Sequence, residues 1–299
     1  MCLNPARFAR GFARGVPLGD GDPRVRSQRY LAGPGLFARP RRASYNRATT
    51  PHGGPGQDSE DAGPTCRDTA RGASVPPDRR RMSDEQAIRR AIVAACREMN
   101  GLGINQGTSG NISVRLGGGL LITPSGVPYE RMAPDDIVLL AMDGSFDHAL
   151  RPSSEWRFHR DIMAARPDVG AIVHVHPIYA TAFAICGREI PAVHYMIAAA
   201  GGPTIRCGGY ATYGTEELSQ IALTALQDRS CCLLANHGLI ATGSNLEKAM
   251  WLAVEVETLC RQYAVALQIG DPRVLPDDEI ARVVEKFKSY GLNAGPQSG

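Results

Sequence analysis

Apolar side chains recur at helical spacing soon after residue 82. Intervals of three and four residues separate Ile88, Ile92, Ala95, Met99 and Leu102, which places them on one face of a helix. Residues 83–86 just upstream have the form of a capping box, with Ser83 at the N-cap and Gln86 at N3. Gly101 and Gly103 supply a stop signal. The pattern therefore predicts a helix that begins at Ser83 and ends at these glycines.

Short apolar runs and further helical segments follow one another down the rest of the chain. Strands are predicted at residues 120–123, 137–141, 169–175 and 231–235. Helices are predicted at residues 155–166, from a second capping box at 244–247 onward, and at 277–288. The elements lack a clean βαβ rhythm and show no internal repeat. We therefore expect an α/β protein in three layers, with a central mixed, mostly antiparallel sheet flanked by helices.

The first 81 residues differ in composition from the rest. They contain 10 Pro and 11 Gly and show neither helical nor strand periodicity, so they lack the apolar surface needed to offset the entropy of ordering. We expect residues 1–81 to be a disordered leader and residues 82–299 to form one domain. An organelle transit peptide and a nucleic-acid-binding tail stay open for this Arg-rich leader. The preferred interpretation is that translation starts at Met82.

Charge and cysteine content limit the binding partners and the cellular location that we expect for the predicted domain. The leader carries a net charge of +8, whereas residues 82–299 carry −5, so the domain is not expected to bind nucleic acid. No run of eighteen apolar residues is present, and no membrane partner is expected. The eight cysteines form no C-x-x-C pair and no disulfide framework. A reducing, cytoplasmic location is therefore expected.

Three of the seven histidines lie where a metal ion could be held. His174 and His176 stand two residues apart in a predicted strand, so both imidazoles project from the same face and can converge on one ion. His237 follows another apolar strand and precedes Gly238, which permits a sharp turn. Three histidines with one open position form a Lewis-acid centre. An ordinary pair of histidines at a strand end remains the alternative.

The other histidines carry weaker signals. His52 lies in the leader, His148 in a polar turn that is expected to be solvated, and His159 in a predicted helix, where it is interpreted as structural. Asn236 beside His237 could orient an imidazole.

A carboxylate that could move protons stands near the start of a predicted helix. Glu155 follows Ser153 and Ser154, either of which could cap that helix and place Glu155 in its first turn. The alternative is that Glu155 only complements the helix dipole.

Three small-residue segments could bind an anion. They are the loop 107–111, the turn 123–126 and the serine pair 153–154. Backbone N–H groups in such turns and at helix N-termini bind phosphate without Lys or Arg. No Walker-type lysine and no G-x-G-x-x-G motif is present, so nucleotide binding is not indicated.

Several of these segments, taken in order, carry a family likeness. Residues 105–111, 153–159, 190–202, 236–240 and 285–292 together resemble the class II aldolase and adducin family, and within it the fuculose-phosphate type of aldolase. The resemblance covers essentially all of residues 82–299. It implies the class II aldolase fold, a ring-shaped homotetramer with sites at subunit interfaces, and a small phosphorylated sugar as substrate.

The resemblance also implies roles for individual residues. One zinc ion per subunit would be held by His174, His176 and His237, and Glu155, the catalytic acid and base, would also touch it. Tyr195 from a neighbouring subunit would give a proton to the aldehyde oxygen, and Tyr290 would close over the substrate. The phosphate would be held by Thr108, Asn111, Ser125, Gly126, Ser153 and Ser154.

The implied reaction is cleavage of L-fuculose 1-phosphate, or a similar ketose 1-phosphate, to dihydroxyacetone phosphate and L-lactaldehyde. The domain's three lysines, Lys248, Lys286 and Lys288, lie in predicted helices among polar residues, which argues against a Schiff-base mechanism. Two other reactions on the same scaffold stay open, namely a salvage aldolase of the 5-deoxyribulose-1-phosphate type and a pentulose-phosphate 4-epimerase. A non-catalytic module like the adducin head is the remaining alternative.

Overall fold

A seven-stranded sheet organises the part of the chain that the computed structural model describes, residues 77–287. Its strand order is β3-β2-β1-β4-β7-β6-β5, and only β5 and β6 pair in parallel. This confirms the predicted mixed, mostly antiparallel sheet. The strands are β1 Asn111–Leu116, β2 Gly119–Ile122, β3 Val138–Ala141, β4 Ala171–Val175, β5 Cys207–Gly208, β6 Cys231–Leu234 and β7 Gly238–Gly243.

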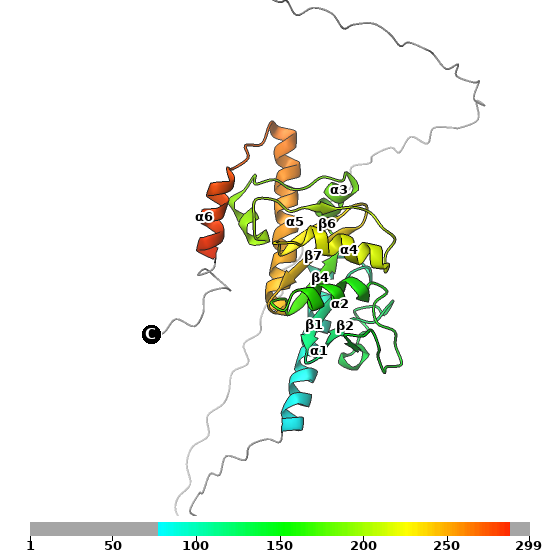
Figure 1. The fold of residues 1–299 in the computed structure, drawn as a ribbon. Coiled ribbons are helices and arrows are strands. Elements are labelled where there is room, and N and C mark those ends of the chain that lie inside the picture. The colour runs from blue at the N-terminus through cyan, green and yellow to red at the C-terminus, as the bar shows by residue number, and fades with distance from the viewer. Residues whose placement is uncertain (1–76, 288–299) are drawn as a thin grey trace, which may run out of the picture. The chain divides into compact units, whose positions relative to one another are not determined.

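Helices cover both faces of the sheet (Figure 1). Alternate side chains of a strand point to opposite faces, so Val173 of β4 joins one core cluster and Ile172 joins the other. The first cluster includes residues of α1, α3, α5 and α6, and the second includes residues of α2 and α4. The expected three layers are therefore present. The helices are α1 Pro77–Gly101, α2 Trp156–Ala165, α3 Ile178–Ile185, α4 Glu216–Ala225, α5 Leu246–Ile269 and α6 Asp277–Phe287.

Predicted and observed elements agree where the apolar pattern is strong. The four predicted strands correspond to β2, β3, β4 and β6, and the later predicted helices correspond to α2, α5 and α6. The predictions omitted β1, β5, β7, α3 and α4, together with two short 3-10 helices, Pro134–Asp136 (η1) and Tyr195–Ala200 (η2). None of the described helices combines the length and apolar composition that a membrane-spanning segment requires.

The predicted starts of α1 and α5 are wrong. α1 begins at Pro77 rather than at Ser83, because proline suits the first helical turn, where its missing N–H costs no hydrogen bond. α5 is capped by Asn245 rather than Ser244: the Asn245 side chain accepts a hydrogen bond from the Lys248 N–H at 2.9 Å. Asparagine is as good an N-cap as serine. The expected disorder of the leader falls largely on residues outside the described range, and the domain boundary at Met82 stays a prediction.

Candidate active site

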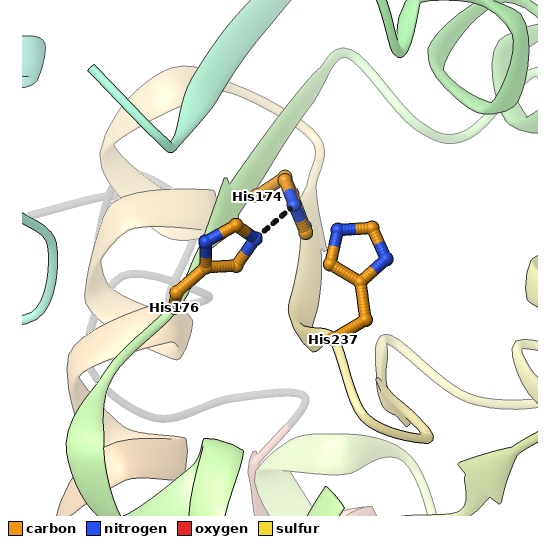
Figure 2. A group of neighbouring side chains, drawn as sticks. All are labelled: His174, His176 and His237. Atoms are coloured by element: carbon orange, nitrogen blue, oxygen red, sulfur yellow. Dashed lines mark hydrogen bonds between the residues drawn. The ribbon is translucent and has the colours of Figure 1, made fainter. Parts of the chain in front are cut away.

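The side chains of three histidines meet at one point, as predicted (Figure 2). His174 lies in β4 between β1 and β7, and His176 follows just beyond the strand. His237 sits in the turn between β6 and β7. One nitrogen from each ring lies within 4.8 Å of the others, and the Nε2 atoms of His174 and His176 are 2.9 Å apart. This group of donor atoms can hold a metal ion.

The turn that carries His237 is built differently from the prediction. The left-handed residue is Asn236, with φ of 53°, and not Gly238. Gly238 is needed for close approach instead: a Cβ there would lie 2.5 Å from Cδ2 of His176 and 2.6 Å from the Val175 carbonyl oxygen. The absence of a side chain at Gly238 therefore lets His176 lie against the turn.

Replacing Gly238 with Ala is expected to destabilise the protein by about 1–3 kcal/mol, the usual cost of overpacking a tight contact. Because the added methyl group collides with His176, metal affinity should fall as well. Thermal unfolding and metal content after gel filtration measure the two effects. Gly118→Ala is the matched control, since Gly118 is exposed and a Cβ there meets nothing within 4 Å. Equal stability of the two variants would contradict the role given to Gly238.

A backbone carbonyl orients the most buried imidazole. His174 is 0% exposed, and its Nδ1 lies 2.9 Å from the Leu239 carbonyl oxygen. A carbonyl only accepts, so Nδ1 carries the proton and Nε2 presents its lone pair to the other histidines. Sequence reasoning missed this contact, because Leu239 reaches His174 only through the pairing of β4 with β7.

Glu155 places its carboxylate against two of these histidines. It is 5% exposed, with Oε2 3.2 Å from His174 Nε2 and Oε1 3.1 Å from His237 Nε2. The prediction placed Glu155 in the first turn of a serine-capped helix, which is wrong: Glu155 is itself the N-cap of α2, with no side-chain cap. Its N–H donates to Ser153 Oγ at 3.3 Å. With the helix starting one residue later, the carboxylate is free to face the histidines.

The charges of this group fit a bound cation. Burial raises the pKa of the Glu155 carboxyl, but the imidazoles of His174 and His237 lower it by more, and the net pKa lies well below its usual range. Burial, with His174 and His237 nearby, lowers the pKa of His176 to about 3. Oε1 of Glu155 is buried without a hydrogen-bond donor. A buried carboxylate and three imidazoles whose nitrogen and oxygen atoms converge in this way are the donor set of a metal ion.

The three predicted phosphate-binding segments lie beside one another. Ser153 N–H donates to the Thr123 carbonyl at 2.9 Å, and Ser125 N–H donates to the Arg151 carbonyl at 3.0 Å. The loop 107–110 leads directly into β1, which pairs with β2 just before the turn at Thr123. Thr108, Ser125, Gly126 and Ser154 are exposed and Ser153 is buried. Their binding of phosphate stays a prediction.

Asn111 has a further role that its sequence context did not indicate. Its side-chain Nδ2 donates to Glu155 Oε2 at 3.0 Å, and its Oδ1 lies 2.5 Å from His159 Nε2. His159 is completely buried, and its Nδ1 lies 2.7 Å from Ser113 Oγ. The signal that could have revealed this contact is the spacing of Glu155 and His159, four residues apart around the start of one helix.

The remaining predicted residues lie outside this cluster or outside the described range. Tyr195 begins η2 and is 50% exposed. Its action in the site of a neighbouring subunit stays a prediction. Tyr290 lies outside the described residues. His148, expected to be solvated, instead joins its loop to η1, with Nε2 2.8 Å from the Asp135 carbonyl oxygen and Nδ1 accepting from the Leu150 N–H.

Known proteins are similar to this chain in sequence and in fold. The family model for the class II aldolase and adducin N-terminal domain matches residues 90–264. The chain is 56% identical over 208 residues to 5-methylthioribulose-1-phosphate/5-deoxyribulose-1-phosphate aldolase of Rhodospirillum rubrum, across 70% of this chain and 94% of that protein. It is 52% identical over 210 residues to L-fuculose phosphate aldolase of Escherichia coli K12, across 70% and 98%.

A solved structure agrees with these sequence matches. L-fuculose 1-phosphate aldolase matches the fold with a TM-score of 0.66 and 38% identity, covering 68% of this chain and 96% of that one. A mixed sheet that joins three histidines and a buried carboxylate defines an enzyme with a site for a metal ion. The chain belongs to the class II aldolase and adducin family. Within the family it is an aldolase, a lyase, like the relatives that it matches over nearly their full length.

Proposed function

We propose that this protein is a zinc-dependent aldolase that cleaves a ketose 1-phosphate to dihydroxyacetone phosphate and a small aldehyde. The observation that carries the proposal is the convergence of His174, His176 and His237 on the buried carboxylate of Glu155. An adducin-like module without catalysis has no need for this cluster. The neighbouring loops rich in backbone N–H groups suit the phosphate of the substrate.

Zinc is the proposed metal because of the donor set. Three imidazoles with a carboxylate or an open position are typical of catalytic zinc sites. When bound, the ion supplies Lewis-acid chemistry by drawing electron density from the substrate's ketone. Leu239 would fix the His174 ring for this purpose through its carbonyl, as partners of metal-binding histidines generally do.

Two proton transfers complete the proposed reaction. The C3–C4 bond breaks with its electron pair going to C3, the C4 hydroxyl loses its proton and becomes the aldehyde, and C3 gains a proton. We assign delivery of the proton at C3 to Glu155, whose Oε1 has no hydrogen-bond donor in the fold. We assign acceptance of the proton that the C4 hydroxyl loses to Tyr195 of a neighbouring subunit in a homotetramer, since the residue is exposed on its own chain. In the reverse direction Tyr195 gives this proton back to the aldehyde oxygen.

The proposed phosphate site is formed by three segments that lie together. Thr108 and Asn111 come from the loop before β1, Ser125 and Gly126 from the turn after β2, and Ser153 and Ser154 from the segment before α2. Asn111 keeps one amide hydrogen beyond its contact with Glu155. We propose Tyr290 as the residue that closes over the substrate. A cytoplasmic location is proposed from the free thiols among the described cysteines.

Two candidate functions, with three candidate substrates between them, fit this site. L-fuculose 1-phosphate, which yields L-lactaldehyde, is the first proposed substrate, and the relative at 52% identity is named for it. The relative at 56% identity is named for 5-methylthioribulose 1-phosphate and 5-deoxyribulose 1-phosphate, which favours a salvage aldolase as the second candidate. The three sugars carry the same phosphate end and differ in the part that leaves as the aldehyde.

The full chain, loaded with zinc, is expected to release dihydroxyacetone phosphate from at least one of these three sugars. The best substrate should exceed the worst by about 10–200-fold in kcat/KM, the range that a small apolar difference supports. Release is measured with a coupled NADH-dependent reductase, and a chelator-treated sample is the control. Release from none of the three would refute the aldolase assignment, and equal rates with and without chelator would refute the metal. Interconversion of pentulose 5-phosphates without cleavage would favour the epimerase.

A further inference from the structure

Glu155 is the end point of a buried chain of hydrogen bonds that runs behind the proposed active site. Asn111 Nδ2 donates to Glu155 Oε2 at 3.0 Å, His159 Nε2 lies 2.5 Å from Asn111 Oδ1, and Ser113 Oγ lies 2.7 Å from His159 Nδ1. All four residues are at most 5% exposed. Water is therefore excluded from most of their polar atoms, and each atom depends on its partner in the chain.

The direction of these hydrogen bonds follows from what each group can do. The Asn111 amide oxygen only accepts, so His159 Nε2 carries a proton and donates. Burial lowers the pKa of His159 to about 3, so the ring is neutral and its Nδ1 accepts from the Ser113 hydroxyl. The Asn111 amide nitrogen then faces Glu155. Ser113, His159 and Asn111 therefore each donate to the next residue, and the Glu155 carboxylate is the final acceptor.

This chain makes the two oxygens of Glu155 unequal. Each oxygen faces one imidazole, Oε2 that of His174 at 3.2 Å and Oε1 that of His237 at 3.1 Å. Only Oε2 also accepts a hydrogen bond from Asn111, whereas Oε1 is buried without one. If the Asn111 amide turned over, its oxygen would face the carboxylate and repel it. The carboxylate only accepts, so it selects the orientation with Nδ2 toward Glu155, and His159 in its Nε2–H tautomer selects the same orientation by donating to the amide oxygen.

We propose that His159 is a positioning residue that holds the Asn111 amide in one orientation. Asn111 then holds Glu155 by a hydrogen bond to Oε2, and Glu155 exchanges protons with the substrate through Oε1. This inference rests on the proposed aldolase function. It revises the interpretation of His159 as purely structural. An apolar side chain could fill the same space beside Phe158, whose ring centroid lies 4.6 Å from that of His159, but it could not determine the direction of the amide.

The test compares His159→Leu with His159→Gln in the full-length, zinc-loaded protein. Leu removes the donor, and kcat should fall about 10–100-fold, as for other residues that orient site ligands, with KM little changed. Gln places an amide N–H near the former Nε2 and should restore most of kcat. Met163→Leu is the control, because Met163 is equally buried on α2 and takes no part in the chain. Equal kcat for wild type and His159→Leu, or for the Leu and Gln variants, would overturn the proposal.

A second readout does not depend on catalysis. In protein labelled with ¹⁵N-histidine, NMR should show His159 as the neutral tautomer protonated at Nε2, and the Nδ1-protonated tautomer would overturn the proposal even if His159→Leu fails to fold. Failure of the proposed aldolase function and failure of the positioning role of His159 give different results. If the wild type cleaves no ketose 1-phosphate, the proposed function fails while the tautomer still tests the chain. If the wild type is active and the Leu variant is equally active, only the positioning role fails.

Discussion

The variant Glu155→Gln is expected to keep its fold and its metal while losing turnover by about 10²–10⁴-fold, the usual effect of removing a general acid or base. Glutamine has nearly the same shape and can still accept from Asn111 through its amide oxygen. It cannot carry a transferable proton at the position of Oε1, the atom that faces His237 at 3.1 Å. Single-turnover release of dihydroxyacetone phosphate measures the chemical step directly.

Two controls make this result specific to Glu155. Glu217→Gln removes an exposed carboxylate in the first turn of α4 and should leave kcat unchanged. The metal content of Glu155→Gln, measured after gel filtration, should match the wild type because the three histidines remain. Full activity of Glu155→Gln would disprove the catalytic role, and loss of its metal would show that the carboxylate acts mainly as a ligand.

The variant His237→Ala is expected to lose its metal ion and, with it, nearly all activity. The histidine group would fall from three imidazoles to two, and Oε1 of Glu155 would lose its neighbouring ring. Each remaining ring would still be held by β4 and its end, so the sheet should survive. Metal per chain, determined by elemental analysis after gel filtration, is the measurement, and circular dichroism checks the fold.

A histidine from outside the cluster provides the comparison for this variant. His148→Ala removes a ring that joins its loop to η1 through the Asp135 carbonyl and should keep one metal ion per chain. Wild-type protein stripped with a chelator should regain activity when zinc is returned, whereas His237→Ala should not. If His237→Ala purifies with a full complement of tightly bound metal, then the ligand set is wrong.

The sequence could predict much of this site because short-range geometry determines it. Two histidines two residues apart on a strand must share a face, so His174 and His176 could be paired without a structure. His237 could only be suggested as the third ligand, because its meeting with them depends on β7 lying between β4 and β6. That strand was not predicted. Its residues, GLIATG, include two glycines at the ends and small side chains, and strands of that composition carry a weak signal.

Other features were missed because they depend on contacts between distant segments. The capping of α2 could not be decided from Ser153 and Ser154, since either serine is a good N-cap, yet Glu155 takes the position in the structure. The orientation of Asn111 depends on His159, far along the chain. The strand β1 was also omitted, although its alternating apolar residues, Ile112, Val114 and Leu116, carry the period-two signal of a half-buried strand.

The three histidines differ in how firmly the sheet anchors them. His174 is an interior residue of β4, a strand with partners on both sides, so its backbone can open to solvent only when the sheet itself comes apart. His237 belongs to a turn, and part of its side chain is already accessible. Exchange of the ion with the surroundings would therefore proceed by release at His237 first. The lifetime of the loaded site is then governed by brief openings of one turn and not by the stability of the whole domain.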